Sequence, residues 1–323
     1  MKILFITSNR LGDAVLSTGI LQYLMTEHPD AEVTVACGPL GESLFASAPN
    51  VKEVKVLRKK SYARHWLYLW QECRKTKWDI IVDIRDSIVS RILSSKQTFI
   101  WSGGDTSLHK VEQMASVLKL ETPPSPHLWF SDAQMGIARD YIPDGTGAVL
   151  AIGPAANWMG KTWAADRFSE LIARLTGSKG ILPDAPVAVF AAPGEEEIAE
   201  EVLFSIPKKR RIDVIAQLNP GDAAAVLSRC ALYIGNDSGL MHCAVATNIP
   251  TVGLFGPGYP EHYRPWGAHT TYVQTPETAD ELLAPFGGDA SKVTESLMDS
   301  LTVDAVEEAV IEHWQTCAKK KAG

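Results

Sequence analysis

The chain has 323 residues, of which 46% are hydrophobic and 21% are charged, and its formal net charge at pH 7 is −7. This length predicts about two domains, and the composition is that of an ordinary globular protein. The acidic balance argues against a general nucleic-acid-binding protein, which needs a basic face. The first apolar run, residues 3–6, is too short for a signal peptide, and no later run approaches membrane-spanning length. We therefore expect a cytoplasmic protein that binds no nucleic acid.

The five cysteines are scattered along the chain, their number is odd, and none forms a CxxC pair. This spacing predicts reduced thiols and favours neither a disulfide framework nor a zinc site. Residues 146–323 carry 14 Lys and Arg against 22 Asp and Glu, a net charge of −8. An anionic ligand of this half must therefore be held by local groups.

Short apolar runs alternate with segments of helical spacing, which predicts parallel sheets covered by helices on both faces. The series of strands restarts after residues 141–147, so we expect two doubly wound domains, 1–145 and 146–323. Residues 300–321 should form a closing helix with Thr302 or Asp304 as its cap. The expected strands are 2–7, 32–38, 53–57, 79–84, 98–101, 148–154, 186–194, 211–215, 231–237 and 250–257.

Ligands of open parallel sheets bind beyond the carboxyl ends of the strands. After the first strand, residues 8–17 contain only Gly12 where a dinucleotide-binding domain would show GxGxxG, so the sequence does not favour a dehydrogenase. Asp13 follows the same strand, at the expected start of a helix. From its position alone, Asp13 is interpreted as an N-cap whose carboxylate accepts a backbone N–H.

A polar cluster separates two apolar runs within residues 233–257. Asp237 ends a strand, and Ser238 opens a helix that includes His242. Gly239 allows a ligand to approach the backbone closely, and the N–H groups at a helix start favour a phosphate. The alternative is a helix cap beside a histidine that is satisfied within the core.

The cluster reads NDSGLMH and is followed by an apolar strand and FGP, a pattern that resembles the signature of glycosyltransferase family 9, the ADP-heptose:lipopolysaccharide heptosyltransferases. Four other segments agree with this resemblance and occur in the right order. They are RLGDAVLSTGIL (10–21), GPAANWMGKTWAADRFSEL (153–171), PGEEEIAEEV (193–202) and GPGYPEHYRPWG (256–267). The resemblance covers most of the chain and is weak between about residues 40 and 140.

Membership of this family implies a GT-B fold, in which two Rossmann-like domains face each other across a cleft. The N-terminal domain would bind a saccharide or lipid-linked acceptor, and the C-terminal domain would bind the nucleotide-sugar donor. The implied activity is metal-independent, inverting transfer of a sugar, heptose from ADP-heptose, to a lipopolysaccharide-core or related saccharide. The resemblance implies no cofactor.

The resemblance also assigns roles to residues. Lys161 corresponds to the lysine at the donor diphosphate, with Asn157 nearby, and Asp13 matches the proposed catalytic base. Glu195 corresponds to the glutamate that binds the ribose, and Leu218 lies where a residue packs on the base. The other residues expected to contact substrates are Arg10, Gly12, Asp237, Ser238, Gly239, Leu240 and His242.

The residue types fit this chemistry. Many glycosyltransferases of another fold neutralise the leaving diphosphate with a metal held by a DxD motif, and this chain has none; its nearest pattern is DIRD at residues 83–86. A lysine and a helix start can do the same electrostatic work without a metal. The acceptor hydroxyl must lose a proton as it attacks, and Asp13 is the candidate base.

Residues 58–77 hold seven Lys and Arg against one acid. Tyr62, Trp66, Leu69, Trp70 and Cys73 share a helical face, which predicts a helix packed on the sheet with its charges in solvent. The alternative is a contact with an anionic acceptor or, peripherally, with the inner membrane.

Some polar side chains lie outside the signature segments. His109 and Arg85 are candidates for the acceptor side, and the lysines at 319–321 are expected to be a solvated helix end.

Two functional alternatives stay open: a GT-B-like epimerase acting on a UDP-sugar, and a non-catalytic relative that binds nucleotide sugar. The presence of both Asp13 and Lys161 argues against the second alternative, and the NDSGLMH context favours family 9 over the epimerases.

Overall fold

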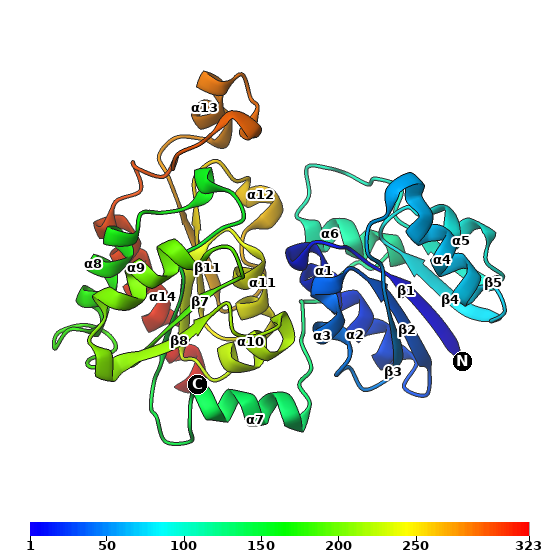
Figure 1. Cartoon of the computed structure of the whole chain (residues 1–323), viewed down its shortest axis with the longest axis horizontal. Coiled ribbons are helices and arrows are strands. Elements are labelled where there is room, and N and C mark those ends of the chain that lie inside the picture. The colour runs from blue at the N-terminus through cyan, green and yellow to red at the C-terminus, as the bar shows by residue number, and fades with distance from the viewer. Residues whose placement is uncertain (323) are drawn as a thin grey trace. The chain divides into compact units, whose positions relative to one another are not determined.

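The computed structural model describes residues 1–322, and within them the chain divides into two compact α/β units (Figure 1). Met1–Ala133 and Asn219–Gly221 form the first unit, and the second begins at Gln134. Each unit is built on its own parallel sheet and has its own hydrophobic core. The prediction of two doubly wound domains is therefore confirmed.

The first unit holds a five-stranded parallel sheet in the order β3-β2-β1-β4-β5. All five strands predicted for this half are present. They are β1 (Lys2–Ile6), β2 (Glu32–Cys37), β3 (Val51–Val56), β4 (Trp78–Asp83) and β5 (Ser95–Ile100). The α-helices are α1 (Leu11–Leu16), α2 (Thr18–Glu27), α3 (Glu42–Phe45), α4 (Arg64–Cys73), α5 (Ile88–Ile92) and α6 (Lys110–Ala115).

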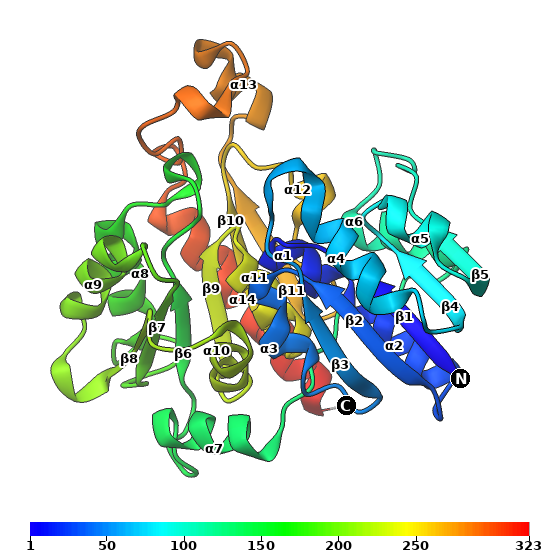
Figure 2. The ribbon, with the colours of Figure 1, turned by 45° about the vertical axis from the view of Figure 1, so that its right-hand side comes forward.

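Helices α4 and α5 lie side by side in the first unit (Figures 1 and 2). Leu69 and Cys73 of α4 are completely buried, and Trp66 and Trp70 pack partly buried against the same cluster. The predicted core-facing side of this helix is confirmed for these four residues. It is wrong for Tyr62, which is 97% exposed because it precedes the helix in a turn with a positive φ of 54°.

The second unit holds a six-stranded parallel sheet in the order β11-β10-β9-β6-β7-β8. Its strands are β6 (Leu150–Gly153), β7 (Val187–Ala191), β8 (Arg211–Ile215), β9 (Leu232–Asn236), β10 (Thr251–Phe255) and β11 (Thr270–Gln274). Sequence reasoning missed β11, because this edge strand pairs only with β10, is not fully buried and therefore has no continuous apolar run. The α-helices are α7 (Asp132–Tyr141), α8 (Ala165–Thr176), α9 (Glu196–Ser205), α10 (Pro220–Leu227), α11 (Gly239–Ala246), α12 (Pro260–Tyr263), α13 (Ala279–Leu283) and α14 (Val303–Ala322).

The predicted closing helix is present as α14. Thr302 is its cap, because its Oγ1 accepts the backbone N–H of Ala305 at 3.2 Å. Arg174 of α8 forms ion pairs with Asp304 and Glu307 of α14, both at 2.7 Å. Of the predicted solvated lysines, Lys319 is exposed, and the side chains of Lys320 and Lys321 lie outside the described residues.

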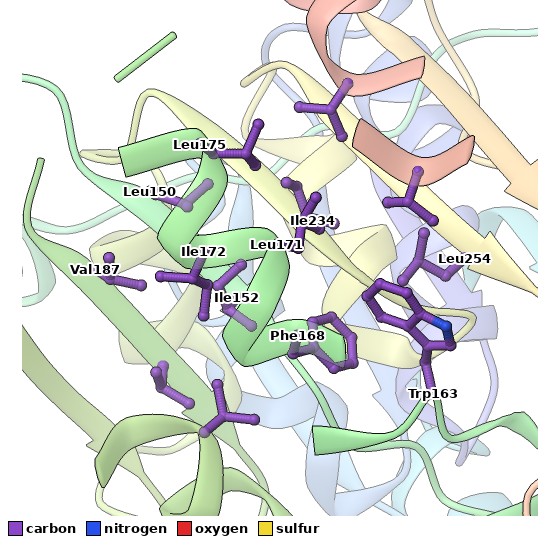
Figure 3. Close-up of a cluster of buried hydrophobic side chains, with 14 of the residues drawn as sticks. Leu150, Ile152, Trp163, Phe168, Leu171, Ile172, Leu175, Val187, Ile234 and Leu254 are labelled. Carbon is purple, nitrogen blue, oxygen red and sulfur yellow. The ribbon is translucent and has the colours of Figure 1, made fainter. Parts of the chain in front are cut away.

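Trp163 is the largest completely buried side chain of the second core (Figure 3). Its ring meets that of Phe168 edge-on, with 4.9 Å between the centroids. Its indole Nε1 donates to the carbonyl oxygen of Leu301 at 2.8 Å. This bond ties the chain just before α8 to the chain just before α14.

All five cysteines are buried, and none of them forms a disulfide. Cys37 and Cys73 lie in the first unit, and Cys230, Cys243 and Cys317 lie in the second.

Tyr233 of β9 imposes a steric constraint on the centre of the second sheet. Gly153 and Gly235 are paired neighbours at the ends of β6 and β9. A Cβ atom on Gly153 would lie 2.1 Å from the Tyr233 hydroxyl oxygen, and one on Gly235 would lie 2.4 Å from it. Only glycine therefore fits at both positions while Tyr233 keeps its place.

We predict that Gly235→Ala lowers the free energy of unfolding by about 1–3 kcal/mol, the usual range for overpacking a buried site. The added Cβ would also lie 2.6 Å from the carbonyl oxygen of Gly153, so backbone as well as side chain must move. Urea denaturation measures the change.

The matched control is Gly136→Ala in α7, where an added Cβ meets nothing within 4 Å. Alanine is the better helix former, so this variant should gain about 0.5–1 kcal/mol. Equal stabilities of the two variants would contradict the steric constraint.

Candidate active site

The candidate site of the second unit lies where the direction of its strand order reverses. From β6 the chain continues outward to β7 and β8, and from β9 it continues to β10 and β11 on the other side. The loops that follow β6 and β9 therefore leave the same edge of the sheet at its topological switch point. This is the place where open parallel sheets bind their ligands.

Asn236, the last residue of β9, holds the loop that follows β6. Its Nδ2 donates to the carbonyl oxygen of Pro154 at 2.7 Å, and its Oδ1 accepts the backbone N–H of Trp163 at 3.2 Å. The side chain is completely buried. One amide thus joins both ends of a loop that carries Lys161, and this positioning role was missed in the sequence because its partners are distant in the chain.

A second set of bonds holds the same loop from its other side. The hydroxyl of Ser296 donates to the carbonyl oxygen of Thr162 at 2.7 Å. The backbone N–H of Leu297 donates to the carbonyl oxygen of Gly160 at 3.1 Å. Lys161 is therefore flanked by two anchored peptide groups.

Lys161 forms an ion pair with Asp237, the residue that follows β9. The lysine side chain is 23% exposed and the aspartate side chain 6%, so the pair is mostly shielded from water. Gly258, just after β10, makes room for the carboxylate, because a Cβ there would lie 2.7 Å from Asp237 Oδ2. An ammonium has three N–H donors, so this contact leaves donors for an anion.

The N-cap residue of α11 directly follows Asp237 in the chain. Ser238 is the N-cap residue, but its side chain makes no cap hydrogen bond, and the Asp237 carboxylate contacts Lys161. The alternative of a plain side-chain cap is therefore wrong. The first N–H groups of a helix have no partner inside it, and their partial positive charge suits an anion. His242 is buried further along α11, and its ring centroid lies 6.5 Å from that of Tyr263.

Tyr233 lies beneath this helix start and was also missed, because it looks like core in an apolar strand. Burial raises the pKa of its hydroxyl. The nearby hydroxyl of Ser238 lowers that pKa, and the negative charge of Glu195 raises it. No aligned hydrogen bond to the Tyr233 hydroxyl forms. The signal in the sequence was the pair of glycines, 153 and 235, that its ring requires.

The other predicted donor residues are placed around the same sheet edge. Glu195 immediately precedes α9, and its carboxylate accepts the backbone N–H of Ala192 at 3.1 Å. Burial raises the pKa of Glu195. Leu218 is half-buried between β8 and α10, and Asn157 is exposed in the loop after β6. Gly239 and Leu240 form the first turn of α11.

Asp13 belongs to the first unit and is the third residue of α1. The interpretation of Asp13 as an N-cap is wrong, because Arg10 occupies that position and no side chain caps the helix. The carboxylate instead accepts the Ser8 hydroxyl at 3.4 Å. Burial raises the pKa of Asp13, and the nearby charges of Arg10, Lys110 and Arg85 oppose that rise. Gly12 precedes it in the same helical turn.

Two of these cations lie on aromatic rings. The Arg85 guanidinium is 5.7 Å from the centre of the Trp66 ring, and the Lys110 ammonium is 5.4 Å from that of Trp101. His109 is 1% exposed and caps α6, accepting the backbone N–H of Val111 at 3.2 Å. Of the two candidates for the acceptor side, Arg85 is thus linked electrostatically to Asp13, and His109 has a structural role.

A hollow in the first unit is lined by residues at the starts of its strands, including Lys2, Glu32 and Trp78, the edge opposite Asp13. Within the described residues, no group of three His, Cys, Asp or Glu side chains is arranged to hold a metal ion. No helix in the described part of the chain has the length and apolar character needed to cross a membrane.

Comparison with known proteins defines the class. The profile of glycosyltransferase family 9 (heptosyltransferase) matches residues 106–282, which is more than half of the chain. Lipooligosaccharide heptosyltransferase 2 of Campylobacter jejuni is 28% identical over 284 residues, covering 82% of this chain and 85% of that protein. The enzyme of the same name from Haemophilus influenzae is 22% identical over 311 residues, covering 85% and 88%.

Solved structures agree on the fold. Escherichia coli ADP-heptose LPS heptosyltransferase II superimposes with a TM-score of 0.76 at 18% identity, covering 98% of this chain and 99% of its own. A family 9 glycosyltransferase from Veillonella parvula gives a TM-score of 0.79 at 21% identity, covering 98% and 96%. The family match and the fold thus define a glycosyltransferase of the two-domain GT-B type. The chain belongs to glycosyltransferase family 9, the heptosyltransferase family, and the alternatives of an epimerase and a non-catalytic relative are not retained.

We predict that Asn236→Ala weakens the loop that carries Lys161. The substitution leaves the Pro154 carbonyl and the Trp163 N–H buried without their partner, at a cost of about 1–3 kcal/mol for each group. Urea denaturation should show the loss. Asn157→Ala, in the same loop but exposed, should leave stability unchanged. Equal stabilities for the two variants would refute the anchoring role.

Proposed function

We propose that this enzyme transfers heptose from ADP-heptose to a lipopolysaccharide-core or related saccharide acceptor, with inversion and without a metal ion. The observation that carries the proposal is the lysine, Lys161, held beside Asp237 at the start of α11. Its relatives support the choice of sugar and acceptor, since they are named lipopolysaccharide or lipooligosaccharide heptosyltransferases.

The donor diphosphate would lie against Lys161 and the first turn of α11. Breaking the bond between sugar and diphosphate leaves negative charge on ADP, and a lysine together with a helix start stabilises such charge. Glu195 would accept hydrogen bonds from the ribose hydroxyls, and Leu218 would pack on the base. Asn157, Ser238, Gly239, Leu240 and His242 would complete the donor contacts.

Asp13 is the proposed general base. The acceptor oxygen attacks the anomeric carbon as the carbon–oxygen bond to the diphosphate breaks, and the proton of the acceptor hydroxyl passes to the Asp13 carboxylate. A single displacement of this kind inverts the anomeric centre. Arg10 and Gly12, in the same turn as Asp13, would bind the acceptor. If that acceptor is lipid-linked, the enzyme works at the inner face of the cytoplasmic membrane as a peripheral protein.

Lys161→Ala should weaken ADP binding by about 10- to 100-fold, the loss expected for a charge-assisted contact. The substitution also leaves the Asp237 carboxylate buried without its partner, so part of the loss has a second cause. Isothermal titration calorimetry with ADP measures the effect. An unchanged affinity removes Lys161 from the donor site.

The double variant Lys161→Met/Asp237→Asn separates these two causes. It keeps the aliphatic stem of the lysine and replaces the buried charge by a neutral group of the same shape. If Lys161 binds the diphosphate directly, ADP binding stays weak in the double variant. Recovery of wild-type affinity would mean that the single variant failed because of the uncompensated carboxylate.

Asp13→Asn should lower turnover by about 10²–10⁴-fold, as removal of a general base does, while leaving ADP affinity and melting temperature near wild type. Burial raises the pKa of Asp13, and a base acts only when it is deprotonated. In the wild-type enzyme kcat/KM should therefore fall as the pH decreases through this raised pKa. Turnover of the Asn variant close to that of the wild type would leave the reaction without this base.

Transfer should continue after treatment with EDTA, because the lysine and the helix start replace the metal in the proposed leaving-group chemistry. One structural relative, TibC of Escherichia coli, is described as an iron-containing glycosyltransferase; it has a TM-score of 0.58 and 14% identity, so metal content needs direct measurement. The assay compares chelated enzyme with enzyme supplied with Mg²⁺, Mn²⁺ or Fe²⁺. Activity that is lost on chelation and restored by one ion would overturn the metal-free mechanism.

A further inference from the structure

Exposed apolar side chains are concentrated in one part of the first unit. Of the twelve large apolar side chains that are exposed among the described residues, five fall within residues 62–92. We call these five side chains the α4–α5 patch. They are Tyr62 (97% exposed), Leu67 (53%), Tyr68 (44%), Ile88 (59%) and Ile92 (55%).

Local backbone structure explains why these side chains face outward. Tyr62 and Ala63 have positive φ angles of 54° and 55°, and this turn sets Tyr62 outside the helix that follows. On α4 the buried residues recur every fourth position, at 65, 69 and 73, so Leu67 and Tyr68 lie on the outer side. On α5, Ile88 and Ile92 are four residues apart and share a face.

The patch is not needed to build the core. Cys73 and Leu69 of α4 already fill the inner side, together with Val89 of α5. Helices α4 and α5 lie side by side (Figures 1 and 2), and the exposed side chains of both belong to the surface of one unit. Apolar side chains gathered this way on a surface mark a contact with something outside the chain.

Cations accompany the patch. Arg58, Lys59, Lys60 and Arg64 are all exposed, and none of them forms an ion pair with another described residue. The chain as a whole has a net charge of −7, so this local excess of positive charge is opposite in sign to the net charge of the protein. A surface that presents apolar side chains among uncompensated cations complements an anionic lipid bilayer, in which the cations meet head groups and the apolar groups reach the acyl boundary.

We infer that the α4–α5 patch docks this enzyme on anionic lipid bilayers. The patch also lies at a useful place in the fold. Helices α4 and α5 follow the carboxyl ends of β3 and β4, the same sheet edge from which α1 carries Asp13. Arg85 connects the two regions, since its guanidinium lies over the Trp66 ring of α4 and its positive charge opposes the rise in the pKa of Asp13. Docking would bring this edge to a lipid-linked acceptor; that consequence rests on the proposed function, whereas the docking itself does not.

The test measures binding of the full chain to vesicles, without donor or acceptor. One vesicle contains phosphatidylcholine alone, and the other replaces about a third of it by phosphatidylglycerol. Each basic residue near an anionic surface raises the partition coefficient about fivefold, so Lys59→Glu/Lys60→Glu should lower binding to the anionic vesicles by about 25-fold or more. Tyr62→Ser/Leu67→Ser should lower it by about tenfold through lost apolar burial.

The second unit offers matched controls. Lys208 and Lys209 are an exposed lysine pair there, and Phe204 is 63% exposed. Lys208→Glu/Lys209→Glu and Phe204→Ser should leave vesicle binding near wild type. Melting temperature and ADP affinity, measured on every variant, identify any that fail to fold and report separately on the donor site.

Several results would overturn the inference. One is a wild-type enzyme that does not bind anionic vesicles. Another is an equal loss in the Lys59/Lys60 and Lys208/Lys209 variants, which would indicate only a general charge effect. A third is full vesicle binding by Tyr62→Ser/Leu67→Ser. If instead the Lys59/Lys60 variant binds vesicles normally but has a raised KM for a water-soluble saccharide acceptor, the cations belong to acceptor binding and the docking surface is refuted.

Discussion

The candidate donor site depends on a single buried amide, that of Asn236. Its two hydrogen bonds close the loop after β6 onto the end of β9, and the position of Lys161 depends on that closure. Lys161 comes next to Asp237, and the pair stands at the first turn of α11. An amide suits this task because it donates and accepts in fixed directions and adds no charge to the interior.

The charged groups Lys161 and Asp13 have opposite surroundings in the two units. In the second, the cation Lys161 is balanced by a mostly buried carboxylate, and a Gly258 without a side chain leaves the space for it. In the first, the carboxylate Asp13 is surrounded by Arg10, Lys110 and Arg85, and burial works against their effect on its pKa. In the proposed mechanism, Lys161 stabilises the leaving anion and Asp13 takes a proton, and these two tasks need different surroundings.

Most of the fold follows from the local pattern of the sequence. The apolar runs of β1, β2, β9 and β10 are almost continuous because both faces of a parallel strand are covered. The pattern fails for β11, whose residues are only half-buried at the sheet edge, and for Tyr62, where a positive φ interrupts the helical spacing. The family signature singled out Lys161 and Asp237, which form an ion pair in the structure. Neither Asn236 nor Tyr233 could be assigned its role, because each acts on partners distant in the sequence.

Every thiol of this chain is buried, so the labelling of its cysteines can report local opening of the structure. Cys37 and Cys73 lie within the first unit, and Cys230, Cys243 and Cys317 lie within the second. A maleimide or a disulfide reagent reaches such a group only when the structure around it opens, so the rate of labelling reports the frequency of local opening. Mass spectrometry assigns each label to its cysteine. Local opening of each unit can thus be followed separately in one sample, without introducing any substitution.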